Sequence, residues 1–592
     1  MQAKHREAVF RIARLAPIFV AVSMLASCGG DGGGNDEPPA PPPLPTNSNL
    51  LIGTPHGDLA PYLTERLGLV STPENASGSA DGLGDVLLLS APNGLSAAHA
   101  SLPTLKNAFE QGKAVALLHA DEGEISTLLM ALGMDMDYPP PDDGTPYELF
   151  AVRRAGGDTH FFVTLGGGEP EDNPTSYQIH EEEVPTTMPE VDESVAQGVR
   201  ADNFARWVEE MKEKAQAKAD TPAAKDETTS LRDLAETFFH DVDLSDMGQS
   251  FVIRYAINAV HSFTNDLDFY FVTQSASLNP KPSGLRKWIW RGSCATYFRW
   301  QADGQLIESN EPAQVGHMRH YIFKNYWGAD PGNTLPLDPN HHSPPTTRPR
   351  QRITSSVSQT TGGSLGIDIK GLGATISSGV TYSNSVTFEI RDVAIDNQAG
   401  TDGGKHLAAW QYTFANPATV KELFCYWAMN DAPELSYTTF QPTNQWLWTV
   451  PSAFSDTQKN GFKAEFNWTN GLSVAGRPPI HLKWLGRTKV FWVPIEAIRP
   501  PLLATDEAQL NFTKVGQFKP VKLISARDWT ATSDADWLSI DEKSGSKTGK
   551  NGIELRIMVE PNDSGAYRKG YITLRSADGK HVKVIEAFQG QY

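Results

Sequence analysis

Residues 48–168 alternate short apolar runs with amphipathic segments, a pattern typical of an α/β domain. The expected elements are strands at 50–52, 86–89, 114–118, 148–153 and 160–165 and helices at 101–111 and 122–132. We therefore predict a small parallel or mixed sheet with helices on its faces. No glycine-rich phosphate loop follows the first strand, so the pattern favours a structural or protein-binding role for this domain.

The character of the chain changes twice after this domain. Residues 169–249 are acidic, and mixed charges at helical spacing in 201–219 predict an exposed helical connector. Residues 250–504 carry short alternating apolar and polar runs between Gly, Pro and Asn turns, which predicts antiparallel β structure. Eleven of the 14 Trp residues lie between Trp288 and Trp492.

Within that β region, residues 353–390 form the most regular alternation of the chain. Its apolar positions are Ile353, Val357, Leu365, Ile367, Ile369, then Leu372, Ala374, Ile376, Val380, Tyr382, Val386, Phe388 and Ile390. The apolar residues have odd numbers before Lys370-Gly371 and even numbers after it. A two-residue hairpin turn requires this change of parity, because the residues that flank the turn share a face. The predicted register places Ile369 opposite Leu372 and Ile353 opposite Phe388.

The other face of this predicted hairpin consists almost entirely of Ser, Thr and Gly, and Asp368 and Glu389 are its only charges. Each arm holds about 17 residues, or roughly 58 Å, whereas a strand that crosses a membrane needs only about 9–11 residues. Small uncharged residues suit the water-filled side of a barrel, and apolar residues suit its lipid side. The alternative is a long hairpin that stays packed in a β-sandwich with its Ser and Thr residues in solvent.

The first thirty residues have the organisation of an export signal. A basic start precedes an apolar run at 15–25, and Leu25-Ala26-Ser27-Cys28 resembles a bacterial lipobox. The resemblance implies cleavage after residue 27, lipidation of Cys28 and a place in the cell envelope, at the outer membrane or cell surface. A plain secretory peptide, and so release from the cell, is the alternative. Residues 28–47 are rich in Gly and then Pro, as in a tether.

Composition and net charge exclude several further classes of protein. The chain has 592 residues and a net charge of −19, which argues against nucleic acid as a partner. Three Cys residues exclude a disulfide scaffold and any Cys-rich zinc module. Cys294 and Cys425 lie in strand-like runs. They either pair in an oxidising compartment or remain two separate buried thiols.

Three short motifs suggest catalysis or metal binding, and each fails in its context. Residues 362–366 have the spacing of a nucleophile elbow but lie inside the alternating hairpin. Residues 241–246 begin like a calcium loop without its glycine. His341 and His342 are adjacent and have no third ligand nearby. We therefore expect no enzyme activity, no cofactor and no metal site.

A Ser/Thr/Gly-rich amphipathic hairpin inside a Trp-rich β region resembles the stem of β-pore-forming toxins of the leukocidin/haemolysin family. The resemblance covers about residues 250–500. It implies a β-sandwich around the stem, a hinge at 344–350 and an aromatic membrane rim, for which Trp446, Trp448 and Trp484 are the candidates. The lipid anchor and the α/β domain depart from the secreted members of that family.

Residues 505–592 resemble the BACON family of immunoglobulin-like β-sandwiches. The resemblance rests on the paired Trp529 and Trp537, on Asn562 followed by Arg568-Lys569-Gly570, and on the closing strand that ends in Gln589. It implies carbohydrate or mucin binding or a spacer role. Trp529 and Trp537 are candidate glycan contacts, although buried aromatic residues also anchor sandwiches.

The first functional hypothesis is an exported, lipid-anchored protein that oligomerises on a target membrane and inserts the hairpin 353–390 to form a pore. Its partners would be a membrane lipid or glycan receptor and further copies of itself. The alternative is a surface glycan-binding or adhesin lipoprotein without pore activity. The overall prediction is a multidomain chain with a small α/β domain and mainly β structure after it.

Overall fold

The computed structural model describes residues 44–590 with gaps, of which the longer ones are 167–192, 221–234, 281–287, 328–336, 361–380, 452–461 and 495–501. Strands dominate the described part, which agrees with the prediction of a mainly β multidomain chain. None of the helices in this part is long and apolar enough to cross a membrane.

The first part of the described chain has the predicted α/β pattern. Its elements are β1 (Leu50–Ile52), α1 (Ala60–Leu67), β2 (Val70–Thr72), β3 (Val86–Leu89), α2 (Leu102–Glu110), β4 (Ala114–Ala120), α3 (Glu122–Ala131), β5 (Tyr147–Ala155) and β6 (Asp158–Thr164). Every element expected here is present, and α1 and β2 are additional. Strands β2, β1, β3 and β4 are parallel, and β5 and β6 are added antiparallel.

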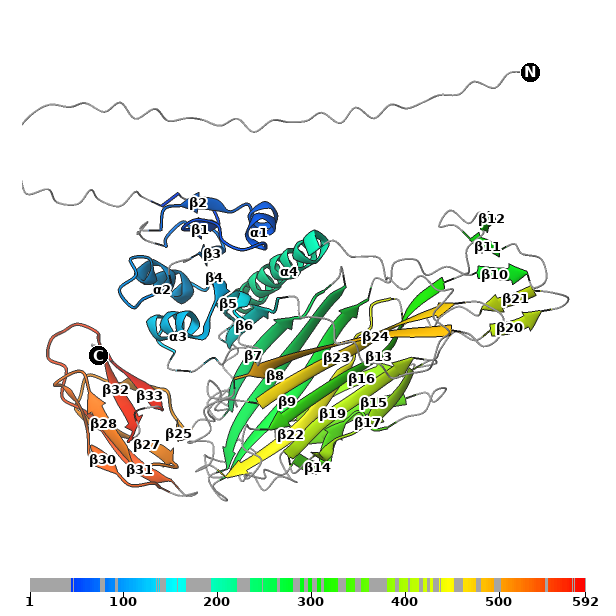
Figure 1. Ribbon diagram of the computed structural model, residues 1–592. Coiled ribbons are helices and arrows are strands. Elements are labelled where there is room, and N and C mark those ends of the chain that lie inside the picture. Colours follow the sequence, from blue (N-terminus) through cyan, green and yellow to red (C-terminus); the bar gives the residue numbers. More distant parts are fainter. Residues whose placement is uncertain are drawn as a thin grey trace, which may run out of the picture. The chain divides into compact units, whose positions relative to one another are not determined.

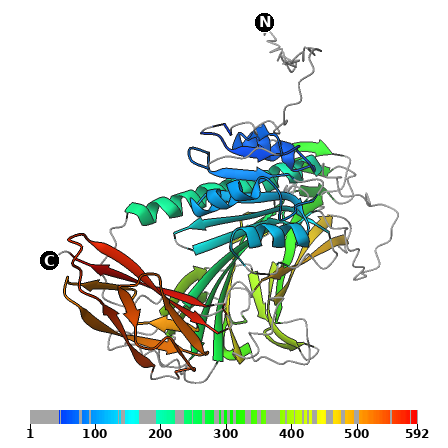
Figure 2. The ribbon, with the colours of Figure 1, turned by 90° about the vertical axis from the view of Figure 1, so that its left-hand side faces the viewer.

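Helices cover both faces of this sheet, as expected for strands that are apolar on both sides. Leu105 and Phe109 of α2 and Leu128 of α3 share one core with the sheet. On the other face, α1 packs together with the long helix α4 (Glu193–Asp220). The buried residues of α4 include Phe204, Trp207, Val208 and Met211. The prediction of an exposed connector is therefore wrong for α4, which lies along the sheet as a packed layer (Figure 2).

The sheet does not end at the predicted boundary near residue 249. Strand β7 (Ala235–Asp243) pairs parallel with β6, and antiparallel pairing continues through β8 (Ser250–Ser262), β9 (Leu267–Asn279), β22 (Thr443–Pro451) and β14 (Leu337–Ser343). The result is one eleven-stranded sheet that joins the α/β part to the β region (Figure 1).

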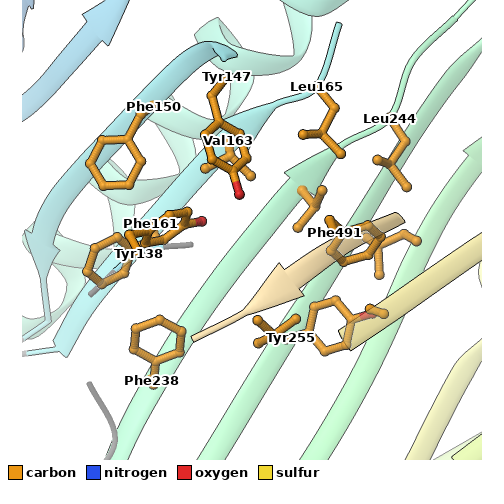
Figure 3. Close-up of a cluster of buried hydrophobic side chains, with 14 of the residues drawn as sticks. Tyr138, Tyr147, Phe150, Phe161, Val163, Leu165, Phe238, Leu244, Tyr255 and Phe491 are labelled. Carbon is orange, nitrogen blue, oxygen red and sulfur yellow. The ribbon is translucent and has the colours of Figure 1, made fainter. Parts of the chain in front are cut away.

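A second large sheet shares its core with the β half of the first. Its order is β17 (Val393–Asn397), β19 (Lys405–Phe414), β13 (Gln314–Trp327), β23 (Phe462–Val474) and β24 (His481–Val493), and β18 (Gly400–Asp402) pairs with β19. Phe251 of β8 contacts Phe466 of β23, with ring centroids 5.7 Å apart. Figure 3 shows Tyr255 and Phe491 in the same cluster as Phe238 and Leu244, so the hydrophobic core is continuous from the α/β part onward.

Two smaller sheets complete the β region. One has the order β12 (Leu306–Ser309), β11 (Tyr297–Trp300), β10 (Trp288–Arg291), β21 (Tyr426–Met429) and β20 (Thr419–Glu422). The other is a two-stranded ribbon of β15 (Ile353–Thr360) and β16 (Thr381–Phe388).

The C-terminal β domain consists of two sheets around its own core. The first contains β25 (Leu503–Thr505), β27 (Gln517–Ser525), β31 (Ile553–Val559) and β29 (Leu538–Ile540). The second contains β26 (Gln509–Phe512), β33 (Val582–Gln589), β32 (Arg568–Ser576), β28 (Trp529–Ser533) and β30 (Ser544–Gly545). Buried and exposed positions alternate along β31 and β32, as expected for strands with one wet face.

Candidate functional site

The base of the predicted hairpin has the predicted register. Strands β15 and β16 are antiparallel, Ile353 is paired with Phe388, and Gln359 is paired with Tyr382. Within the described part of the chain, this ribbon pairs with no other strand, so it is not one of the central pairs of a large sheet. The segment 361–380 lies outside the described residues. So do the stem candidates Leu365, Ile367, Ile369, Leu372, Ala374, Ile376 and Val380.

The cross-strand pairs of the ribbon form two alternating sets of different composition. Residues opposed across a ladder lie on the same face of it, and successive pairs alternate between the faces. One alternating set contains only Ser and Thr: Thr354 with Thr387, Ser356 with Ser385, Ser358 with Ser383 and Thr360 with Thr381. The other set is mixed: it begins with the apolar pair of Ile353 and Phe388, and its next pairs are Ser355 with Val386, Val357 with Asn384 and Gln359 with Tyr382. By this pairing, one alternating set is entirely hydroxylated and uncharged, and the other holds all the apolar residues of the ribbon.

The chain that leads into the ribbon is held at a fixed point. The Pro344 carbonyl accepts hydrogen bonds from Asn397 Nδ2 at 2.7 Å and from Trp410 Nε1 at 3.0 Å. The Asn397 backbone N–H also donates to Thr346 Oγ1 at 3.0 Å. These contacts join the start of the predicted hinge to β17 and β19. The rest of that hinge, 347–350, lies outside the described residues.

Two of the predicted rim residues are interior residues. Trp446 and Trp448 are 1% and 0% exposed, and they pack against Trp410 and Trp327 of the second sheet, with ring centroids 5.6 and 5.4 Å apart. The rim prediction is wrong for both residues, because the second sheet covers the face of β22 on which their side chains lie. Trp484 lies on β24, and its side chain is outside the described part.

A buried polar network joins the two large sheets, which the sequence analysis did not anticipate. Gln274 Nε2 donates to Tyr255 Oη at 2.7 Å, and Tyr255 Oη donates to Asn325 Oδ1 at 3.1 Å. Asn444 Nδ2 donates to Gln274 Oε1 at 2.8 Å, and Tyr412 Oη donates to Asn444 Oδ1 at 2.6 Å. Burial raises the pKa of both tyrosines, so they remain neutral donors.

A charge cluster fixes α4 to the sheet. Arg254 of β8 donates to both oxygens of Asp241 at 2.7 and 2.8 Å and to both oxygens of Glu210 at 2.7 and 2.9 Å. Burial alone raises the pKa of Glu210, but the hydrogen bonds and charge of Arg254, with Lys214, outweigh it and lower that pKa to about 2. Burial raises the pKa of Asp241, and Arg254 opposes this rise.

The two candidate glycan contacts of the C-terminal domain differ in their exposure to solvent. Trp529 is 1% exposed and lies in the core against Gly545, so the prediction that it contacts glycan is wrong. Trp537 is half-buried, and the guanidinium of Arg568 lies 4.3 Å from its ring centroid. The exposed aromatic residues are instead Tyr567, at 57%, and Phe518, at 56%. Tyr567 is stacked on Phe588, with ring centroids 5.9 Å apart.

The remaining predicted sites are Cys28, Cys294 and Cys425, and all three lie outside the described residues. The described part holds no group of three or more His, Cys, Asp or Glu residues that could bind a metal ion. The calcium-like segment 241–246 serves packing instead. Asp241 binds Arg254, and the Asp243 carboxylate accepts hydrogen bonds from Asn203 and from the Ser245 backbone N–H.

Comparison with known proteins finds one family model that matches most of the C-terminal domain. Residues 527–585 match the family BACON, described as "Putative binding domain, N-terminal", which confirms the resemblance of this region. No curated protein matches the chain.

Solved structures share only limited likeness with the chain. A GH5 xyloglucanase of Bacteroides ovatus in complex with a heptasaccharide has a TM-score of 0.14 and 22% identity, over 15% of this chain and 19% of that one. A structure described as "Pore forming protein" has a TM-score of 0.26 and 12% identity, over 45% of this chain and 96% of that one. The D0-D1 domain of intimin has a TM-score of 0.12 and 10% identity, over 33% and 80%. These likenesses define no shared overall fold.

Proposed function

We propose that the protein is an exported, lipid-anchored β-pore-forming protein that assembles on a target membrane. The ribbon β15–β16 supports this proposal most directly, because its register gathers only Ser and Thr in one alternating set of pairs and all of its apolar residues in the other. Several copies of such a hairpin, closed into a ring, would satisfy every backbone hydrogen bond in lipid. The proposed activity needs no catalytic residue. Cys28 would carry the anchor, at the outer membrane or cell surface.

The isolation of the ribbon also favours this function. A hairpin that must leave its monomeric position cannot be hydrogen-bonded into a sheet on both edges. Within the described residues, neither β15 nor β16 has a second strand partner. The contacts of Pro344 with Asn397 and Trp410 would hold the lead-in segment at the body while the ribbon extends.

A shortened hairpin tests the proposal. Thr360 and Thr381 are directly paired, so replacing 361–380 by Asn-Gly closes the ladder with a two-residue turn. Each arm then has 8 residues, fewer than the 9–11 or so that a membrane strand needs. The full chain should release dye from liposomes, and the shortened variant should keep its circular dichroism spectrum but release none. Equal release by both proteins would refute the proposal.

We also propose that the C-terminal domain binds surface carbohydrate and so selects the target. The BACON match and the exposed Tyr567, which is stacked on the half-buried Phe588, support this, because sugar rings stack on exposed aromatic side chains. On a glycan array, Tyr567→Ala should lose binding that the full chain shows. Phe518→Ala is the matched control, because Phe518 is equally exposed but lies on the other sheet. Without any array signal from the full chain, this second function is wrong.

A further inference from the structure

A cavity of about 430 Å³ lies between α4 and the face of the sheet formed by β7, β8, β9 and β22. Its volume is in the range of small-molecule sites in proteins, which is about 300–1,000 Å³. The cavity is in the α4-covered part of the sheet and does not involve the ribbon or the C-terminal domain. The proposed pore and carbohydrate functions do not use it.

Most of the charge at this cavity is already paired, but one cation is not. Arg254, Glu210 and Asp241 line the cavity and are hydrogen-bonded as described above, and Lys214 Nζ lies 3.2 Å from Glu210, so two cations balance the two carboxylates. Arg206 lies on the exposed side of α4 and also lines the cavity. No carboxylate of the described chain pairs with Arg206, so its guanidinium is available to an anionic ligand.

Hydroxyl and amide groups line the opposite wall. Ser275 and Ser277 are two positions apart on β9, so their side chains share a face. Thr443 of β22 is paired directly with Ser275, which adds a third hydroxyl beside them. Gln441 adds an exposed amide. Within the described residues, these four side chains make no hydrogen bond, so all of them can serve a ligand.

Helix α4 also contributes an aromatic side chain to the cavity. Trp207 lines the cavity and is only 3% exposed, yet its indole Nε1 has no hydrogen-bond partner in the described chain. That Nε1 atom has essentially no accessible surface, so Trp207 contributes ring surface to the cavity and no donor.

We propose that this cavity binds a sugar acid, a polyhydroxylated molecule of monosaccharide size that carries one carboxylate. The hydroxyls of Ser275, Ser277 and Thr443 and the amide of Gln441 match the hydroxyl groups of a saccharide. The Arg206 guanidinium matches its carboxylate, which it can bind with two parallel hydrogen bonds. A neutral sugar would leave Arg206 without a partner, and a bare inorganic anion would leave the hydroxyl wall unused.

Titration calorimetry of the full chain with D-glucuronate, D-glucose and acetate tests this site. Glucuronate should bind, and glucose and acetate should each bind at least about tenfold more weakly. Arg206→Gln should weaken glucuronate binding about tenfold or more, and Ser277→Val should also weaken it. Arg66→Gln is the control, since Arg66 is a half-exposed arginine of α1 that does not line the cavity.

Three results would overturn the proposal. They are no binding of glucuronate, equal binding of glucose and glucuronate, and equal binding of acetate and glucuronate. Arg206 is exposed and makes no contact that the fold needs, so a folded variant is expected. A thermal melt of Arg206→Gln that matches that of the unsubstituted chain would establish this.

Discussion

Ile353 is paired with Phe388 at the base of the ribbon, and this one pair fixes the parity of both strands. With that register, odd positions before the turn and even positions after it belong to the set that holds the apolar residues, together with Ser355, Gln359 and Asn384. The alternating positions between them belong to the Ser/Thr set. Extended along the sequence to the turn at 370–371, the same parity places Ile376 in the apolar set and Ser377 in the polar set. The pore proposal therefore assigns neighbouring residues to lipid and to water.

The buried network between the two sheets predicts unequal effects for neighbouring residues of β22. Asn444 is 1% exposed and links Gln274 to Tyr412. Asn444→Leu leaves the hydrogen-bonding atoms Gln274 Oε1 and Tyr412 Oη without a partner. Each unsatisfied group should lower the free energy of unfolding by about 1–3 kcal/mol. Gln445 is half-buried and donates only to Thr273 Oγ1, so Gln445→Leu should cost less than about 1 kcal/mol. Urea unfolding of the two variants measures this difference. Equal unfolding midpoints would show that the network adds no stability.

The charge cluster predicts a large effect for Arg254. Arg254→Met leaves the buried carboxylate of Asp241 without its cation, which should lower the free energy of unfolding by about 3–5 kcal/mol. Adding Asp241→Asn should restore part of that loss, because the unpaired buried charge is removed. Arg206→Gln on α4, an exposed arginine beside the cluster, should change stability by less than about 0.5 kcal/mol. Thermal unfolding compares the three variants. If the double variant is no more stable than Arg254→Met, the lost stability has another source.

His240 predicts a specific loss of stability in acid. It is fully buried, its Nε2 lies 3.2 Å from Tyr138 Oη, and burial lowers its pKa to about 3. The unfolded chain therefore binds one more proton than the folded chain between about pH 3 and 6.5, and stability falls as the pH falls through that window.

The magnitude of this effect can be measured with His240→Gln. Between pH 7 and pH 5, the unsubstituted chain should lose about 2 kcal/mol more than the variant. Unfolding titrations of both proteins at pH 5, 6 and 7 provide the comparison. Parallel pH profiles would mean that His240 does not titrate on unfolding.

The local pattern of apolar and polar residues was sufficient to predict those helices and strands whose packing partners are close in the sequence. The α/β strands and helices and the Ile353–Phe388 register follow from periodicity and from one turn, and the structure confirms them. Helix α4 was misinterpreted although its signal is present: Phe204, Trp207, Val208 and Met211 have the 3-4-7 spacing of a buried stripe. The mixed charges around them suggested exposure.

Long-range pairing was not predictable from local pattern. The parallel contact of β6 with β7 joins strands about seventy residues apart, and no turn encodes it. For the same reason, Trp446 and Trp448 looked like exposed aromatic residues, because only the packing of the second sheet buries them. The cluster of Arg254, Glu210 and Asp241 likewise draws on three separate elements. Each of its members is an ordinary charged residue in the sequence.

Dye release from liposomes by two neighbouring lysine variants tests the pore proposal most directly. Ile376→Lys would place a charge toward lipid, at a cost of about 2–4 kcal/mol per copy near the middle of the bilayer, whereas Ser377→Lys would place the same charge toward the water-filled lumen. We expect Ser377→Lys to release dye as the unsubstituted chain does and Ile376→Lys to release almost none, with both variants equally well folded. Full release by Ile376→Lys, or loss of release by Ser377→Lys alone, would contradict the assignment of the two faces and with it the proposed function.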